Sequence, residues 1–256
     1  MSSQPFSQAP ESSTRRVDWG TESRRALRTF AAVTAAAVAS AFVVGGLGGR
    51  LAMGLLAAQN PEDHGRLTDD GFVMGQLTVG GTVNLVVTAI FLGLLGSLFY
   101  LALRGLLIGP LWFQVASLSI GAGVVVGALL VSPEGVDFAL LDPPLLPIGL
   151  FVAIPVLYVA MLVLLAHRFL RPTSWFATGD LRLIAVVTAA LWIPGLPLLP
   201  LVVALVLVWA AWERVRSTGL AAVVRSPATQ WAARGLLAVV FGAAVISLSN
   251  DIQTLA

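Results

Sequence analysis

The sequence lacks cysteine and lysine altogether, contains only two histidines, and devotes 11% of its residues to charged side chains. The absence of cysteine excludes disulfides, thiolate metal sites and cysteine nucleophiles. A soluble domain carries about 25% charged residues, so this chain has too little polar surface to face water on all sides. All its basic residues are arginines, and its net charge of +2 does not indicate a nucleic-acid partner. These absences leave the membrane as the expected environment.

Of the 256 residues, 57% are hydrophobic. Many of them form long apolar runs that contain no charged residue. A helix needs about 20 apolar residues to cross the hydrocarbon core of a bilayer. Seven runs approach that length, so we predict an all-α, polytopic transmembrane helix bundle over residues 25–256. Residues 1–24 are polar and rich in serine, and we expect a disordered cytoplasmic tail there. The predicted spans are about 29–49, 78–103, 111–131, 145–166, 181–195, 198–212 and 231–248.

The stretch 181–212 is too long for a single span, because one unbroken helix would measure about 48 Å. Three prolines, Pro194, Pro197 and Pro200, lie within seven residues of this stretch, and proline removes helical hydrogen bonds. A helical hairpin that turns at these prolines also keeps the flanking arginines on one side of the membrane. We therefore predict two short spans here and seven in total.

The placement of the arginines orients the predicted bundle. With seven spans, 13 of the 15 arginines fall on the N-terminal side, and only Arg50 and Arg66 fall on the other. The positive-inside rule then places the N-terminus in the cytoplasm and the C-terminus outside the cell. We expect a multi-pass protein of the plasma membrane. The arginines on the N-terminal side are Arg15, Arg16, Arg24, Arg25, Arg28, Arg104, Arg168, Arg171, Arg182, Arg214, Arg216, Arg225 and Arg234.

The first apolar run also raises the alternative of a cleaved export signal, because the segment from Ser23 to Arg28 resembles a twin-arginine motif. The apolar core of such a signal has about 7–15 residues. This run is longer and continues to Ala58, so we expect it to stay as a membrane span.

Small residues recur at four-residue spacing on each of the first three predicted spans. Helices in lipid associate through close backbone contact, which small side chains permit. We therefore predict tight packing among these three spans, against the alternative that glycine and alanine are simply common in membrane helices. The three stripes are Ala37, Ala41, Gly45 and Gly49; Ala89, Gly93 and Ser97; and Ser119, Gly123 and Gly127.

None of the predicted spans carries Asp, Glu, Lys or His at its centre. Proton-coupled carriers place such groups at mid-membrane, so their absence weighs against a proton relay. Intramembrane proteolysis lacks support as well, because His64 and His167 lie outside the span centres and Asp180 stands alone at a boundary. We expect no catalytic residue, no cofactor and no metal centre.

Arg50 is the most unusual charged residue, because it follows a glycine-rich helix end on the side that holds few arginines. A charge at the membrane boundary needs a partner or water. One interpretation is a structural ion pair with an acidic residue of the same side, for which Asp69, Asp70, Asp137 and Asp142 are candidates. The other is recognition of an anionic ligand or a lipid headgroup.

Two external loops hold these aspartates. In the first loop, Asp70-Gly71 between two short runs predicts a β-hairpin over the outer helix ends. The loop's acidic residues and His64 suit a divalent cation by type, but their spacing matches no defined site, which favours an ordinary solvated loop.

Asn84, in the outer part of the second span, is the most polar residue placed within a span. An interhelical hydrogen bond is the simplest role for it.

Three groups of residues resemble a set of integral membrane proteins of actinobacteria that have no established activity. The resemblance covers about the first 160 residues and implies a plasma-membrane location in a Gram-positive bacterium. It brings no activity, cofactor or catalytic residue. The segments that carry it are 45–53, 68–75, and 135–143 with 154–158.

Two classes of function remain open. A non-enzymatic membrane component, such as a scaffold, sensor or partner subunit, is favoured by the missing catalytic groups and the small-residue helix faces. A small-solute facilitator or transporter without an intramembrane proton relay is favoured by the proline-broken hairpin and Arg50. A polar cavity reaching mid-membrane would favour transport, whereas a closed bundle would favour a component role. An enzyme acting on lipid is more distant. The expected partners are the lipid bilayer and either another membrane protein or further copies of the chain.

Overall fold

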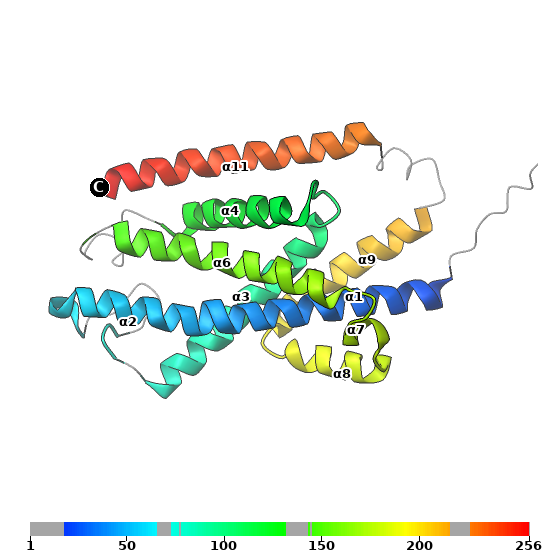
Figure 1. Ribbon diagram of the computed structural model, residues 1–256, viewed down its shortest axis with the longest axis horizontal. Coiled ribbons are helices and arrows are strands. Elements are labelled where there is room, and N and C mark those ends of the chain that lie inside the picture. The colour runs from blue at the N-terminus through cyan, green and yellow to red at the C-terminus, as the bar shows by residue number, and fades with distance from the viewer. Residues whose placement is uncertain are drawn as a thin grey trace, which may run out of the picture.

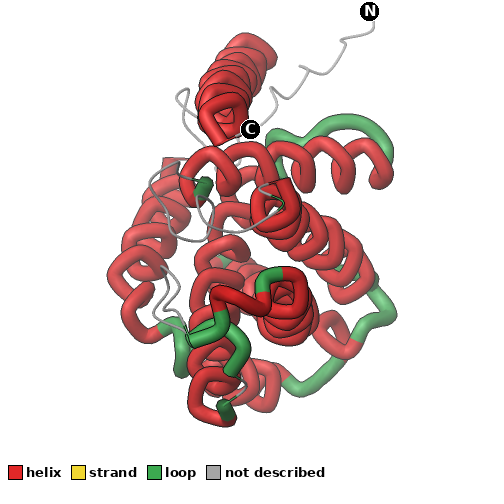
Figure 2. Tube along the Cα trace, turned by 90° about the vertical axis from the view of Figure 1, so that its left-hand side faces the viewer, coloured by secondary structure: helices red, strands yellow, loops and turns green. Residues whose placement is uncertain are grey.

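The computed structural model describes residues 18–65, 73–76, 78–131, 143, 145–215 and 226–255. The structure is 85% helical and has no strand within these ranges, as Figure 2 shows. The prediction of an all-α helix bundle is thereby confirmed. The predicted β-hairpin falls mainly on residues 66–72, which lie outside the described residues, so it stays a prediction.

The first helical element is one continuous rod built from α1 (Trp19–Ser40), η1 (Ala41–Gly48) and α2 (Gly49–Gln59). Its 41 residues span about 60 Å at 1.5 Å per residue, roughly twice the hydrocarbon thickness of a bilayer. The middle segment η1 is a π-helix, in which i→i+5 hydrogen bonds replace the usual i→i+4 pattern. The rod therefore extends well beyond the span predicted at 29–49.

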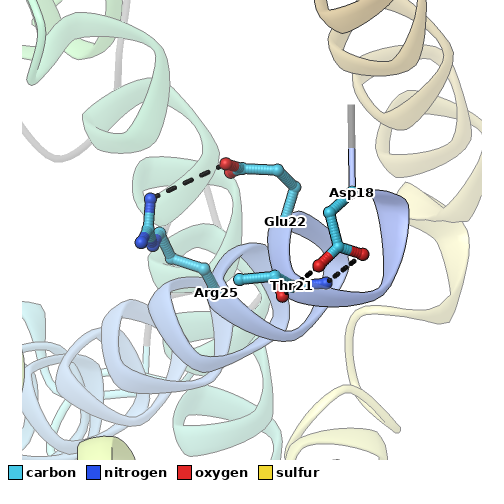
Figure 3. Close-up of polar contacts among 4 residues, drawn as sticks. All are labelled: Asp18, Thr21, Glu22 and Arg25. Carbon is cyan, nitrogen blue, oxygen red and sulfur yellow. Dashed lines mark hydrogen bonds and ion pairs between the residues drawn. The ribbon is translucent and has the colours of Figure 1, made fainter. Parts of the chain in front are cut away.

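Asp18 starts this rod earlier than the sequence suggested. Its carboxylate accepts a hydrogen bond from the backbone N–H of Gly20 at 3.1 Å. It also accepts hydrogen bonds from the backbone N–H and the hydroxyl of Thr21, at 3.4 and 2.6 Å (Figure 3). A side-chain cap of this kind satisfies N–H groups that have no partner within the helix. Residues 19–24 are consequently helical, and the tail boundary expected at residue 24 is wrong.

Four further long helices complete the set that is suited to cross a membrane. They are α3 (Val79–Leu103), α4 (Leu111–Leu130), α6 (Leu145–Phe169) and α11 (Pro227–Leu255). With the rod, five helices of the described chain are long and apolar enough to span a membrane. Figure 1 shows consecutive long helices running in alternating directions, with the C-terminus at the opposite end of the long axis from the start of α1.

The stretch 181–212 breaks at the prolines, as expected, but its halves differ in length. It forms α8 (Leu181–Leu191), the short η3 (Leu196–Leu198) and α9 (Leu199–Val215), preceded by α7 (Trp175–Thr178). The pair is bent by 103° and adds at most one span to the five. The 11 residues of α8 reach only about 16 Å, half the hydrocarbon core. The seven predicted spans are therefore not confirmed.

Both ends of α8 are fastened to the first half of the rod. At its start, Arg28 of α1 donates hydrogen bonds to the carbonyls of Phe176 and Gly179 at 2.7 and 3.0 Å. At its end, the indole of Trp192 donates to Thr34 at 3.0 Å. The turn that follows packs Gly195 against Leu94 in the middle of α3. Accordingly, α8 and α9 both lie in the half of the molecule that holds the start of α1 (Figure 1).

Small residues bring the rod and α3 into close contact, as predicted for the first two stripes. A Cβ added to Gly45 would lie 2.8 Å from the Ala89 methyl, and one added to Gly93 would lie 2.5 Å from the Ala41 methyl. Atoms cannot approach so closely, so only glycine fits at these positions. The two helices therefore meet backbone to backbone through the middle of the bundle.

The third stripe packs elsewhere. Gly123 and Gly127 of α4 face α6, where an added Cβ would collide with Val156 and Val152. The hydroxyl of Tyr158 on α6 in turn donates a 2.6 Å hydrogen bond to the Gly93 carbonyl of α3. The prediction of contact among the first three spans is thus wrong for the third stripe, because α6 lies against α4 on that face.

Candidate functional site

A cavity of about 330 Å³ lies at the end of the bundle where the rod finishes and α3 begins. We call it the α2–α3 cavity. Arg50 and Asn84, two of the candidate residues from the sequence, both face it. Its described lining consists of Arg50, Val73, Gln76, Thr78, Gly80, Gly81 and Asn84.

The first turn of α3 forms one wall. Thr78 is the N-cap of this helix, and its hydroxyl accepts a 3.1 Å hydrogen bond from the Gly81 N–H. The start of an α-helix carries partial positive charge from N–H groups that have no partner within the helix. Gly80 adds no side chain, and open space lies where its Cβ would be. This wall therefore exposes backbone donors to the cavity.

Arg50 forms the opposite wall, and the packing of the rod places it there. It is the second residue of α2, directly after the π-helical segment. Gly46 and Gly49 hold this part of the rod against Val86 and Leu85 of α3. The Arg50 side chain is half-buried, its Nε and Nη2 atoms are buried, and it is engaged in an interaction within the protein. Arg50 is therefore held by the protein rather than projecting into lipid.

The segment 73–76 closes the third side, and the end of the rod holds it in place. The Gly65 N–H donates to the Met74 carbonyl at 3.0 Å, and the His64 ring packs on Gly75, where an added Cβ would lie 3.0 Å from it. Gly75 also has a φ of +79°, which favours glycine. His64 Nε2 lies 3.0 Å from the Ala57 carbonyl of α2. These contacts bring Val73 and Gln76 to the cavity.

Asn84 is the described lining residue that lies farthest along α3. It lies about one and a half turns into α3 and is exposed, so its amide faces the same opening as Arg50. The sequence predicted both residues as candidates but gave no reason to place them together. It missed Thr78 and Gln76, although a threonine immediately before an apolar run is a recognised helix-start signal.

The other sequence candidates, Asp69, Asp70, Asp137 and Asp142, lie outside the described residues. The ion-pair interpretation of Arg50 therefore stays a hypothesis, and the expectation that the first external loop is an ordinary solvated loop stays a prediction. Within the described ranges, no group of three or more His, Asp or Glu side chains is arranged to hold a metal ion.

The chemistry available to the α2–α3 cavity is hydrogen-bond donation. Arg50, the amides of Gln76 and Asn84 and the start of α3 all supply donors, and none of the described lining residues is acidic. A nucleophile paired with a general base is not among them. The arrangement suits binding of a polar or anionic group.

Comparison of the chain with family models, curated proteins and solved structures gave no match. The fold defines the class of protein as a bundle of apolar helices suited to span a membrane.

Proposed function

We propose that the protein is a non-enzymatic component of the plasma membrane, acting as a scaffold, sensor or partner subunit. The observation that supports this most is the extent of the α2–α3 cavity along α3, where Asn84 is the farthest of the described lining residues. Farther along the same interface, Gly45 meets Ala89 and Gly93 meets Ala41 in backbone-to-backbone contact. The rod and α3 are thus closed against each other at mid-bundle, where a solute path between them would have to pass.

The proposed topology has five crossing helices and one re-entrant loop. In this arrangement α8 enters from the cytoplasmic side, the turn at Gly195 reaches the middle of the membrane, and α9 returns. Support comes from the length of α8 and from its attachment at Thr34, about 8 Å inside the predicted first span. The arginine distribution is unchanged, because a re-entrant loop, like a hairpin, leaves both of its ends on one side. The N-terminus is cytoplasmic and the C-terminus is outside.

A small-solute facilitator is the second candidate, and the bent α8–α9 pair favours it. Broken helices that end inside the membrane form substrate sites in several transporter folds, typically as a pair from two related halves. Among its described helices the chain has one bent pair. The second pair that those transporter folds contain has no counterpart there.

Flux measurements on the purified protein in liposomes separate the two proposals. We expect no uptake of sodium, potassium or chloride and no osmotic swelling by small neutral solutes above that of protein-free liposomes. Saturable flux of any of these solutes would overturn the component role in favour of the facilitator. A Gly195→Trp variant, which would disrupt the turn against Leu94, is the matched control for any flux observed.

The exposed apolar side chains of the structure support a proposal about the partners of the protein in the membrane. Large apolar side chains of α9 and α11, including Val208, Leu236 and Val239, are more than 60% exposed. In a membrane such faces contact lipid or another helix. The bilayer, a second membrane protein or another copy of the chain would each cover them.

A further inference from the structure

The lining of the α2–α3 cavity selects for a particular kind of ligand. Three different parts of the chain contribute to it: α2 with Arg50, the segment with Gln76, and α3 with Thr78 and Asn84. Each of these side chains can donate a hydrogen bond, and the arginine adds a permanent positive charge. Thr78, Gln76 and Asn84 also carry acceptor oxygens, but Arg50 supplies the only formal charge among the described lining residues, and its positive charge favours an anion.

Arginine favours one class of anion in particular. Its planar guanidinium presents two parallel N–H groups, which match the spacing of two oxygens on a phosphate or carboxylate. The positive end of α3 adds to this preference, because phosphate groups commonly sit at helix N-termini. The cavity volume of about 330 Å³ is at the small end of ligand pockets, which suits a single headgroup.

The depth of the cavity fits the same ligand. Arg50 follows immediately after the predicted span 29–49, and the α3 wall begins at the N-cap Thr78. In the proposed topology these residues lie where the hydrocarbon core gives way to the polar headgroup region. Lipid phosphates occupy that depth, and dissolved phosphate reaches it from the water side.

We propose that the α2–α3 cavity binds a phosphate group, with Arg50 as the charged anchor and Asn84 and Gln76 as amide donors. The inference deepens the proposed sensor or scaffold role by naming a ligand class for its site. The same binding chemistry serves a phospholipid headgroup or a free phosphate, and two separate probes distinguish these sources.

The experiment uses the full chain purified in a maltoside detergent that contains no phosphate. Isothermal titration calorimetry with inorganic phosphate tests the free anion. Native mass spectrometry with phosphatidylglycerol, and with diacylglycerol as its phosphate-free counterpart, tests the lipid. We expect Arg50→Gln to weaken binding of at least one phosphate probe by about tenfold or more, as for loss of a charged hydrogen bond. Diacylglycerol should bind equally to both proteins.

Two further variants make the result specific. Asn84→Leu removes an amide from an exposed position, so it tests the cavity even if Arg50→Gln fails to fold, and it should weaken binding severalfold. Arg182→Gln removes an exposed arginine at the start of α8, far from the cavity, and should leave binding unchanged.

The outcomes separate cleanly. Loss of binding for phosphatidylglycerol alone identifies a lipid headgroup, and loss for inorganic phosphate alone identifies a free anion. The proposal is overturned if both probes bind equally to wild type, Arg50→Gln and Asn84→Leu, or if the wild type binds neither probe. Solute flux in liposomes would overturn the component role while leaving a positive phosphate result in place, so the two proposals fail independently.

Discussion

The indole Nε1 of Trp192 donates a buried 3.0 Å hydrogen bond to the hydroxyl of Thr34, and this bond joins the end of α8 to α1. Phe30 stacks on the same indole with ring centroids 5.4 Å apart. The 11 residues of α8 also bury Ile184 and Thr188. These contacts fix the position of the α8–α9 turn.

The first prediction concerns this bond. Thr34→Val and Trp192→Phe should each lower the stability of the protein, with a coupling energy near 0.6 kcal/mol in a double-mutant cycle, typical of interhelical hydrogen bonds in membranes. The measurement is reversible unfolding in mixed micelles. Additive effects of the two substitutions would show that the bond contributes nothing. Thr178→Val, at an exposed hydroxyl near α8, is the matched control.

The second prediction tests the glycine contact between α4 and α6. Gly123→Leu should destabilise the protein by about 1–3 kcal/mol, because an added side chain must displace Val156 in a packed interior. Gly121→Leu in the same helix is the control, since nothing lies within 4 Å of an added Cβ there. Thermal unfolding in detergent should separate the two variants. Equal melting temperatures would contradict the packing described for α4.

The third prediction tests the re-entrant loop. Because the chain contains no cysteine, single cysteines report their own accessibility. Ser249→Cys near the end of α11 should react with a membrane-impermeant maleimide on intact cells, whereas Leu196→Cys at the α8–α9 turn should not. Seven spans would put Leu196 outside and make it reactive. Arg171→Cys, which should react only after the cells are opened, serves as the cytoplasmic control.

The fourth prediction concerns the start of the rod. Hydrogen bonds from Thr21 lower the pKa of the Asp18 carboxyl below its ordinary value of 3.8. A lowered pKa in the folded state means that the carboxylate stabilises the helix start above pH 3.8, and that this stabilisation is lost as the pH falls through the lowered value. Hydrogen exchange at Gly20 and Thr21 should therefore be slow at pH 7. It should become fast in Asp18→Ala.

Asp18→Asn provides the control for charge, because asparagine also caps helices. The protection of Gly20 and Thr21, taken relative to the intrinsic exchange rate at each pH, should stay high in this variant and should not change with pH below 4. An Asp18→Ala protein with wild-type exchange rates at Gly20 would show that the cap does not hold the first turn.

The long helices could be predicted from the sequence because hydropathy determines them. The runs expected at 78–103, 111–131 and 145–166 correspond closely to α3, α4 and α6, since continuous apolar segments of that length have no alternative in lipid. The break at Pro194–Pro200 was also predictable, because proline removes helical hydrogen bonds. Its geometry was not, because the contacts of Trp192 and Gly195 that position it are made with distant parts of the chain.

The candidate site was predictable only in part. Arg50 and Asn84 stood out as polar residues near a membrane boundary, but their shared cavity depends on how Gly46 and Gly49 seat the rod on α3. The π-helical geometry of η1 could not be predicted from the spacing of small residues four positions apart either. A period of 3.6 residues assumes regular α-helix, and the segment 41–48 departs from it.

The rod of α1, η1 and α2 has a mechanical consequence. In the proposed topology, its length of about 60 Å makes it emerge from both faces of a bilayer whose apolar core is about 30 Å thick. It contacts α3 most closely near its middle, at Ala41 and Gly45. The rod is held at several points along its length, by Arg28 and Thr34 in its first half and by Gly46 and Gly49 beside Arg50. A displacement of the rod along its axis would therefore move Arg50 and Trp19 together, because both belong to one continuous helical element.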